Sequence, residues 1–406
     1  MIEAIFKQLD EIYEEMVELR RHFHMNPELS FEEVETPKKI ADYHRELGLD
    51  VRTEVGGRGV VATLKGSKPG KTVALRADFD ALPIHEENDL PYKSKIDGVM
   101  HACGHDGHTA EMLCLAKVLV SHKDEIPGNI VFIHQFAEEL TPGGAKPMIE
   151  DGCLDGVDAI FGTHLWSPFP TGTIGYRNGD VMANADRFDV EVIGKGGHGG
   201  MPHQTVDAIV TASRVVSDLQ QIVSRGVDPL KSAVVTVGSF HSGKAFNVVA
   251  EKAAICGTVR TFDPEVRDEI EKKIENIAKH TCQAAGADCN FSFERGYPAV
   301  RNHPEETELL VNAAKQVVEE DHVFEMEPVM GGEDFAYYLQ HVPGTFFFTG
   351  ARNEEIGAEY PHHHPRFNID ERSMPIAGKT LAAAALNYLN ETSGSNSGTT
   401  TNETLA

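Results

Sequence analysis

Positive charge, cysteine and long apolar runs are all scarce in this sequence of 406 residues. Lys and Arg total 37 against 63 Asp and Glu, and the resulting net charge of −26 repels polyphosphates and anionic membrane surfaces. We therefore do not expect nucleic acid as a partner. No apolar run approaches the roughly 18 to 20 residues that a membrane helix needs, so we expect no membrane span either.

Cysteine is too sparse to build a disulfide framework. Six cysteines in a chain of this length suit a reducing compartment, and we expect a cytoplasmic protein. The first ten residues mix acidic with apolar side chains, show no basic leader and are expected to form a surface helix. A serine nucleophile is not expected, because we find no Gly-x-Ser-x-Gly motif.

The length of the chain predicts two domains. Through about the first 180 residues, apolar runs that end in polar turns alternate with helical patterns. This alternation predicts an α/β fold with a mixed, mostly parallel sheet flanked by helices. The predicted strands are 60–64, 72–76, 129–135, 158–162 and 345–349, and the predicted helices are 109–121, 305–320 and 374–389.

A different pattern begins near Arg187. It consists of an alternating strand at 188–192, a helix at 207–224, strands at 233–237 and 253–260, a helix at 264–285 and a strand at 290–293. This βαββαβ order is that of a ferredoxin-like α+β domain. We expect an inserted domain at 187–293, a discontinuous domain made of 1–186 and 294–391, and a disordered polar tail at 392–406.

Potential metal ligands follow several of the predicted strands. Open α/β sheets place their binding crevices at these strand ends, so the side chains are expected to meet at one edge of the sheet. The residues are Asp78 and Asp80 after the strand at 72–76, Glu138 and Glu139 after 129–135, and His164 after 158–162.

Two further groups of potential ligands lie outside the strands. Cys103 and His105 belong to the motif Met-His-Ala-Cys-Gly-His-Asp-Gly-His, in which Gly104 lets the backbone bend. They could serve one metal centre or two adjacent centres. Three consecutive histidines, at 362–364, lie near the end of the globular sequence. A mixed set of thiol, imidazole and carboxylate suits a divalent transition metal and leaves its identity open.

Each of these residues also has a plainer structural explanation when it is taken alone. His164 could be a satisfied core histidine, Cys103 a small core residue, and the two adjacent glutamates a solvated helix start. Their joint occurrence at strand ends favours a metal site. Such a pair of glutamates can direct one carboxylate at a metal and use the other as a general base, which predicts hydrolysis by water without a covalent intermediate.

The sequence resembles the dinuclear-metal aminoacylase, carboxypeptidase and acyl-amino-acid hydrolase family. The nearest branch contains N-acyl amino acid amidohydrolases, hippurate hydrolase and the auxin-conjugate (IAA-amino acid) hydrolases. The resemblance extends to about residue 390. Its motifs are 20–33 (RRHFHMNPELSFEE), 75–83 (LRADFDALP), 100–108 (MHACGHDGH), 135–139 (QFAEE), 196–203 (GGHGGMPH), 331–335 (GGEDF) and the terminal HHP.

The resemblance implies two divalent metal ions per subunit, of Zn, Mn, Co or Ni, with Glu138 as the general base. His363 is chosen from the histidine run because it precedes Pro365 in the H-x-P pattern, with His362 and His364 as alternatives. Asp80 is implied as an orienting residue outside the metal's own ligands. The implied ligands are Cys103, His105, Glu139, His164 and His363.

The inserted domain resembles the lid and dimerisation domain of that family. This implies that His198 reaches a neighbouring active site and stabilises the oxyanion, and that Asn247 and Arg260 hold the substrate's carboxylate. The expected enzyme is a homodimer or higher homo-oligomer that hydrolyses the amide bond of a small N-acyl amino acid. The alternatives are a dipeptidase or carboxypeptidase that uses the same site, and a non-catalytic binding protein.

Overall fold

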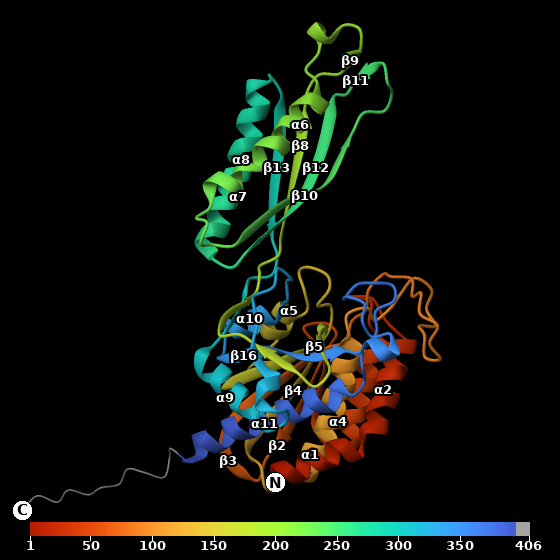
Figure 1. Cartoon of the computed structure of the whole chain (residues 1–406), viewed down its shortest axis with the longest axis vertical. Coiled ribbons are helices and arrows are strands. Elements are labelled where there is room, and N and C mark those ends of the chain that lie inside the picture. The colour runs from red at the N-terminus through yellow and green to blue at the C-terminus, as the bar shows by residue number, and fades with distance from the viewer. Residues whose placement is uncertain (395–406) are drawn as a thin grey trace, which may run out of the picture. The chain divides into compact units, whose positions relative to one another are not determined.

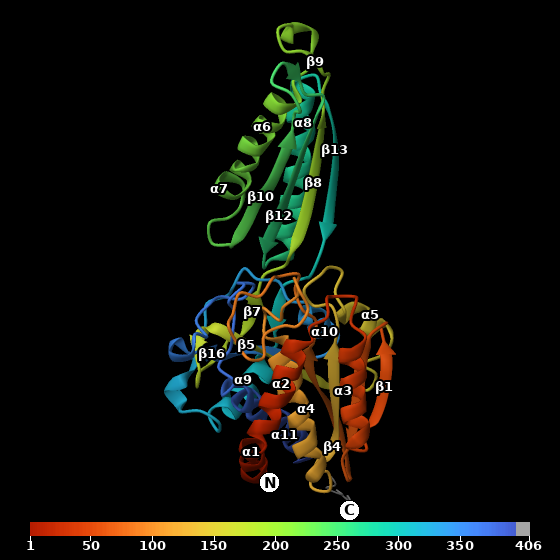
Figure 2. The same ribbon diagram turned by 90° about the vertical axis from the view of Figure 1, so that its right-hand side faces the viewer.

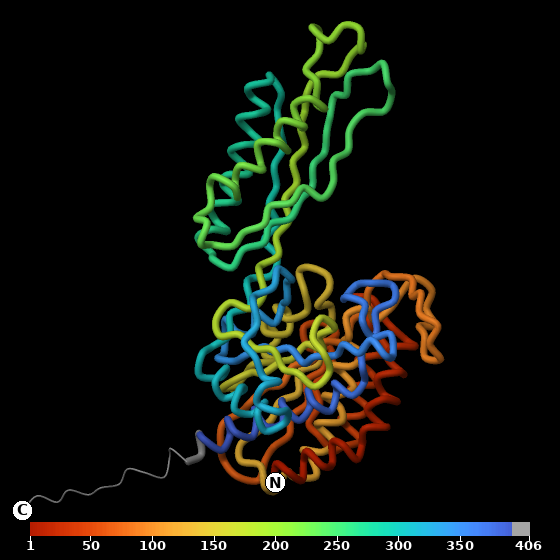
Figure 3. The backbone as a smooth tube through the Cα atoms, viewed as in Figure 1, coloured from red at the N-terminus to blue at the C-terminus, as the bar shows by residue number. Residues whose placement is uncertain are grey.

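The structure is a computed structural model, and it describes residues 1–394 (Figure 1). The chain divides into two compact units. Unit 1 comprises Met1–Val181, Arg301–Glu327 and Asp334–Ala406, and unit 2 comprises Met182–Val300 and Pro328–Glu333. The predicted insertion, 187–293, falls within unit 2. Of the predicted tail, 395–406 lie outside the described residues, whereas 392–394 belong to the last helix. Figure 3 traces the longer segment of unit 2, residues 182–300, as one excursion of the chain, coloured mostly green.

A mixed eight-stranded sheet forms the centre of unit 1. In spatial order its strands are β1 (Asp50–Val55), β2 (Gly59–Lys65), β4 (Pro127–Gln135), β3 (Lys68–Asp78), β5 (Ala159–Pro170), β16 (Gly344–Arg352), β6 (Ile174–Tyr176) and β15 (Val323–Glu325). The central neighbours β4, β3, β5 and β16 run parallel, while β1, β2 and β4 pair antiparallel. The predicted fold class is therefore confirmed.

The helices of unit 1 cover this sheet, and two of them are enclosed within the core. Helix α4 is buried from His105 to Ala116, as expected for a helix that is apolar on nearly all sides. Leu115 of α4 and Leu386 of α11 join Phe132 and Phe161 of the sheet in one core. The helices are α1 (Ile2–Glu11), α2 (Tyr13–Met25), α3 (Glu35–Glu46), α4 (His105–Ser121), α5 (Ala145–Glu150), α9 (Pro304–Ala314), α10 (Phe335–Leu339) and α11 (Ser373–Gly394). Within residues 1–394, no helix is both long and apolar enough to cross a membrane.

Several element ends in unit 1 differ from the sequence prediction. Strand β5 continues to Pro170 because it stays paired with β16 as far as Arg352, so His164 lies inside the strand rather than beyond its end. Helix α4 begins at His105, which places the metal-ligand motif on its first turn. The helix predicted over 305–320 ends at Ala314.

Unit 2 contains a four-stranded antiparallel sheet with its own core. The sheet has the order β10 (Ala233–Ser242), β12 (Lys252–Thr261), β8 (Asp186–Ile193) and β13 (Asp288–Arg295). Phe188, Val190 and Val192 alternate towards a core that they share with the helices, which lie on one face of the sheet (Figure 2). The helices are α6 (Ala208–Leu219), α7 (Gln221–Gly226) and α8 (Pro264–Ala284), and the short strands β9 (Gly197–His198) and β11 (Val248–Val249) form a separate ribbon.

The strands β7 (Gly179–Met182) and β14 (Val300–Asn302) lie where the chain passes between the two units. The helix predicted over 207–224 is divided into α6 and α7 at Gln220.

Candidate metal centre

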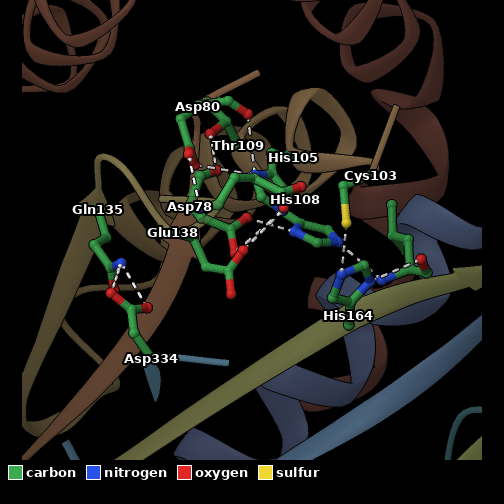
Figure 4. A network of polar contacts seen from close by, with 12 residues as sticks. Asp78, Asp80, Cys103, His105, His108, Thr109, Gln135, Glu138, His164 and Asp334 are labelled. Carbon is green, nitrogen blue, oxygen red and sulfur yellow. Dashed lines mark hydrogen bonds and ion pairs between the residues drawn. The ribbon is translucent and has the colours of Figure 1, made fainter. Parts of the chain in front are cut away.

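The carboxyl ends of β3 and β4, together with the middle of β5, bring the predicted ligands close to one another. Asp78 ends β3, and Glu138 follows β4 by three residues. His164 lies in β5, the other parallel neighbour of β3. Cys103 and His105 reach the same place from the start of α4, where Gly104 adopts a φ of 103° that favours glycine (Figure 4). The fold thus gathers residues that are far apart in the sequence.

The ligand atoms of this group lie at separations that suit a shared metal ion. Cys103 Sγ is 3.3 Å from His164 Nε2, His105 Nε2 is 3.9 Å from Glu139 Oε1, and His363 Nε2 is 3.3 Å from Glu139 Oε2. Bonds of about 2.0 to 2.3 Å in a tetrahedral site separate neighbouring ligand atoms by about 3.3 to 3.8 Å. His105 Nε2 and Glu139 Oε1 are both buried and make no hydrogen bond. A cation would satisfy both atoms.

Asp80 contacts the His105 ring and the backbone of Glu139. Its Oδ1 lies 3.2 Å from His105 Nδ1, and its Oδ2 accepts a hydrogen bond from the Glu139 backbone N–H at 3.0 Å. Burial opposes ionisation of Asp80, but the hydrogen bond and charge of His105 prevail and lower the pKa of the carboxyl group. With Nδ1 of His105 directed at Asp80, its Nε2 is left for a metal.

The histidine run separates into three different environments. His362 Nδ1 lies 3.2 Å from Cys103 O and 3.8 Å from Cys103 Sγ, while its Nε2 accepts from the Ser167 N–H at 3.2 Å. His364 accepts from the Arg366 N–H and stacks on another ring. His363 directs its Nε2 at Glu139, and 53 % of its side chain is exposed. These contacts favour His363 as the ligand from this run.

His108 and Asp78 lie beside the centre. The sequence offered Asp78 as a potential metal ligand and gave His108 no role. His108 Nδ1 is 2.6 Å from Asp78 Oδ1, and its Nε2 accepts from the Leu165 N–H at 2.9 Å. Both ring nitrogens are engaged, so His108 braces β3 against β5 instead of offering a ligand atom. Arg76 donates to Asp78 Oδ2 at 2.6 Å. The only sequence signal for His108 was its place in the motif at 100–108.

The charges around the centre favour a bound cation. Burial opposes protonation of His105, but Asp78, Asp80 and Glu139 together raise its pKa to about 10. Burial, followed by the charges of Glu139 and Glu138, raises the pKa of the Cys103 thiol. Burial lowers the pKa of His164, which keeps it in the neutral form that binds metals. The nearby carboxylates give the site negative charge, which a divalent ion would neutralise, and thiol, imidazole and carboxylate groups are the donors such an ion can bind.

The substrate-binding residues predicted in unit 2 do not all lie together. His198 is exposed on β9 and pairs with Val248, and the Asn247 carbonyl accepts from the Gly199 N–H at 2.8 Å. Arg260 is half-buried near the far end of β12, about 26 Å along the strand from Lys252 at 3.3 Å per residue. One chain thus brings His198 and Asn247 together but leaves Arg260 apart from them.

Comparison with known proteins agrees with this arrangement. Residues 74–387 match the sequence model of peptidase family M20/M25/M40. YhaA of Bacillus subtilis (strain 168), whose name describes it as an amidohydrolase, is 59 % identical over 95 % of this chain and 97 % of its own length. The chain belongs to peptidase family M20/M25/M40.

Two further relatives indicate what members of this family do. An N-acyl-L-amino acid amidohydrolase of Geobacillus stearothermophilus is 48 % identical over 75 % of this chain and 82 % of its own. The crystal structure of the YXEP protein of Bacillus subtilis, a dinuclear metal binding peptidase of family M20, is 36 % identical and has a TM-score of 0.81. That match covers 94 % of this chain and 99 % of that chain. This M20 chain is an enzyme of a hydrolase family, as the sequence predicted, and unit 1 contains candidate metal-binding clusters.

Proposed function

We propose that this M20 enzyme hydrolyses the amide bond of small N-acyl amino acids. The observation that carries the proposal is the convergence of Cys103, His105 and Glu139 donor atoms, all within 4.8 Å of one another, beside a second carboxylate. His164 and His363 complete the proposed ligand set through their short contacts to Cys103 and Glu139. The relative that is named an N-acyl-L-amino acid amidohydrolase supports this choice of substrate.

The proposed ligands would hold two divalent ions, of Zn, Mn, Co or Ni. When bound, the ions would polarise the scissile carbonyl and lower the pKa of the attacking water towards about 7. Glu138 is the general base in this proposal. Its side chain is 8 % exposed, and its Oε2 lies 4.0 Å from His105 Nε2, so it borders the ligand group. It takes a proton from the attacking water and delivers it to the departing amine.

The residues of unit 2 are proposed to bind the substrate in a homodimer or higher homo-oligomer. His198 would donate a hydrogen bond to the carbonyl oxygen as negative charge develops there, and Asn247 and Arg260 would hold the substrate's carboxylate. Because Arg260 lies far along β12 from the β9–β11 ribbon, one chain cannot supply all three to one small molecule. Two chains can, which supports a dimeric active site. The six free cysteines support the expected cytoplasmic location.

A substrate panel with a base variant tests the proposal. Wild-type enzyme loaded with each metal should hydrolyse N-acetyl, N-benzoyl or indole-acetyl amino acids. Glu138→Gln should lower kcat by about 100-fold or more while the bound metal stays unchanged. Full activity of Glu138→Gln would refute the base assignment.

A dipeptidase or carboxypeptidase remains the second candidate, because the solved YXEP relative is described as a peptidase. The same panel separates the two functions when plain dipeptides are included. Turnover of dipeptides alone would refute the substrate class proposed here. A non-catalytic binding protein would turn over neither group of compounds.

A further inference from the structure

The sequence motif at 20–33 ends in a segment, Glu28–Glu33, that touches the loop carrying the general base. The segment follows α2 and is joined to the loop after β3 by the bridge between Leu29 and Ala81 and by the Ala81 N–H bond to Glu28 O, at 2.8 Å. Phe31 has a φ of 65° and packs edge-on against Phe136, with ring centroids 5.8 Å apart. A phenylalanine rarely adopts this backbone region unless its surroundings require it.

Two carboxylates accept hydrogen bonds from the backbone N–H groups of the residues on either side of Glu138. Glu33 Oε1 accepts from the Ala137 N–H at 3.0 Å, on the N-terminal side. Asp80 Oδ2 accepts from the Glu139 N–H at 3.0 Å, on the C-terminal side, and Ser30 Oγ donates to the same oxygen at 2.7 Å. The segment 28–33 therefore reaches both flanks of the general base.

Ala137 is the point at which this support is most needed. It is fully buried and has a φ of 50°, a left-handed conformation that costs a non-glycine residue about 1 kcal/mol or more. The Glu33 carboxyl group accepts the hydrogen bond from its N–H. Without that acceptor, a buried N–H would lose its hydrogen bond directly beside the base.

We propose that Glu33 is a positioning residue for the general base, acting through the Ala137 peptide, with Ser30 as a second support through Asp80. The inference rests on the proposed function, since it takes Glu138 as the base. Glu33 lies outside the ligand set and would change the rate of proton transfer rather than metal binding. Burial, and then the charge of Asp80, raise the pKa of Glu33 to about 8. A neutral side chain of the same shape that keeps an acceptor should therefore perform the role of Glu33.

The test compares Glu33→Met with Glu33→Gln, two side chains of similar size of which only glutamine keeps an acceptor. We expect Glu33→Met to lower kcat by about 10- to 100-fold with KM and metal content unchanged, and Glu33→Gln to retain near wild-type kcat. Amide hydrogen exchange in a peptide covering 136–140 should be faster in Glu33→Met alone. Glu32→Ala, at the exposed neighbour, is the control and should match wild type.

Each other result overturns the inference. Equal kcat in the two Glu33 variants, whether high or low, would show that the acceptor does not matter, and loss of metal in Glu33→Met would assign the effect to the metal centre. If Glu33→Met does not fold, Ser30→Ala is measured, and unchanged kcat and exchange there would also overturn the inference. A wild-type enzyme without amidohydrolase activity would refute the proposed function instead, and the exchange measurement would still decide the role of Glu33.

Discussion

At the scale of single residues, the partners of the two ring nitrogens distinguish the histidines around the metal centre. His105 and His164 each direct Nδ1 at an oxygen, of Asp80 and of the Leu165 backbone respectively, and keep Nε2 for the centre. His108 and His362 have partners on both nitrogens, and each receives a backbone N–H on Nε2. The first pair has the arrangement of metal ligands, and the second pair has that of structural residues.

Removal of one ligand tests the centre directly. Cys103→Ala should reduce the bound metal from about two ions per chain to one or fewer, because it removes a donor that lies beside both His164 and His105. The measurement is metal analysis of purified protein after dialysis. Cys153→Ala is the matched control, since Cys153 is also buried in unit 1 but, among residues 1–394, belongs to no candidate metal cluster. Equal metal content in the two variants would contradict the assignment.

The sequence predicted the candidate ligands better than the residues that support them. Cys103, Glu139 and His363 could be named as candidates because thiol, carboxylate and imidazole groups are potential metal ligands. The family resemblance supplied the choice of Glu139 over Glu138 and of His363 within the histidine run. Glu33 and His108 could not be given roles, because their partners are the backbone N–H groups of Ala137 and Leu165. Such contacts depend on the path of the backbone. The types and spacing of side chains in the sequence do not predict that path.

At the scale of elements, a pair of buried histidines joins α3 to β4. His44 Nε2 lies 2.8 Å from His134 Nε2, and His44 stacks on Phe132. Burial lowers the pKa of His44 to about 4 and lowers that of His134 as well. Both rings are therefore neutral in the folded protein under conditions where they would begin to protonate in the unfolded chain.

This pair predicts a loss of stability in acid. Below the unfolded pKa of about 6.5, these histidines bind protons in the unfolded chain but not in the folded protein. The free energy of unfolding therefore falls by up to about 1.4 kcal/mol per pH unit for each histidine. The contribution is present above pH 6.5 and is lost as the pH falls towards 4. His44→Gln should lower the slope of the unfolding free energy against pH by an amount that corresponds to about one proton fewer bound on unfolding. The measurement is urea unfolding in the presence of a chelator between pH 4.5 and 7. An unchanged slope would show that His44 titrates alike in both states.

Element types were predictable where hydrophobic periodicity was strong, and element ends were not. The alternation in β8 and the apolar runs of β3 and β4 gave strands in the correct places. Strand β5 was cut short in the prediction because Gly162, Thr163 and His164 interrupt its apolar run, although pairing with β16 extends the strand. Helix α3 was missed because its buried face combines Thr36 and His44 with Ile40 and Ala41, so it has no continuous apolar stripe.

At the scale of the whole molecule, each unit has its own buried core. The core of unit 2 is built from its own sheet and helices. The βαββαβ order could be predicted from the sequence because each element has one apolar face. The ligands proposed for the metal centre all belong to unit 1, whereas the proposed oxyanion donor, His198, belongs to unit 2. Catalysis in the proposed dimer therefore depends on residues from both units and from both chains.

Mixing of two inactive variants tests whether His198 serves the active site of the partner chain. Glu138→Gln and His198→Ala should each be inactive as homodimers, but a mixed dimer has one site with an intact base and an intact donor from its partner. Random reassembly at equal amounts makes half of the dimers mixed, so activity should return to about a quarter of wild type. His203→Ala, at an exposed histidine near His198, should be active by itself and serves as the control. If the mixture is no more active than its inactive parents, His198 does not act across the dimer.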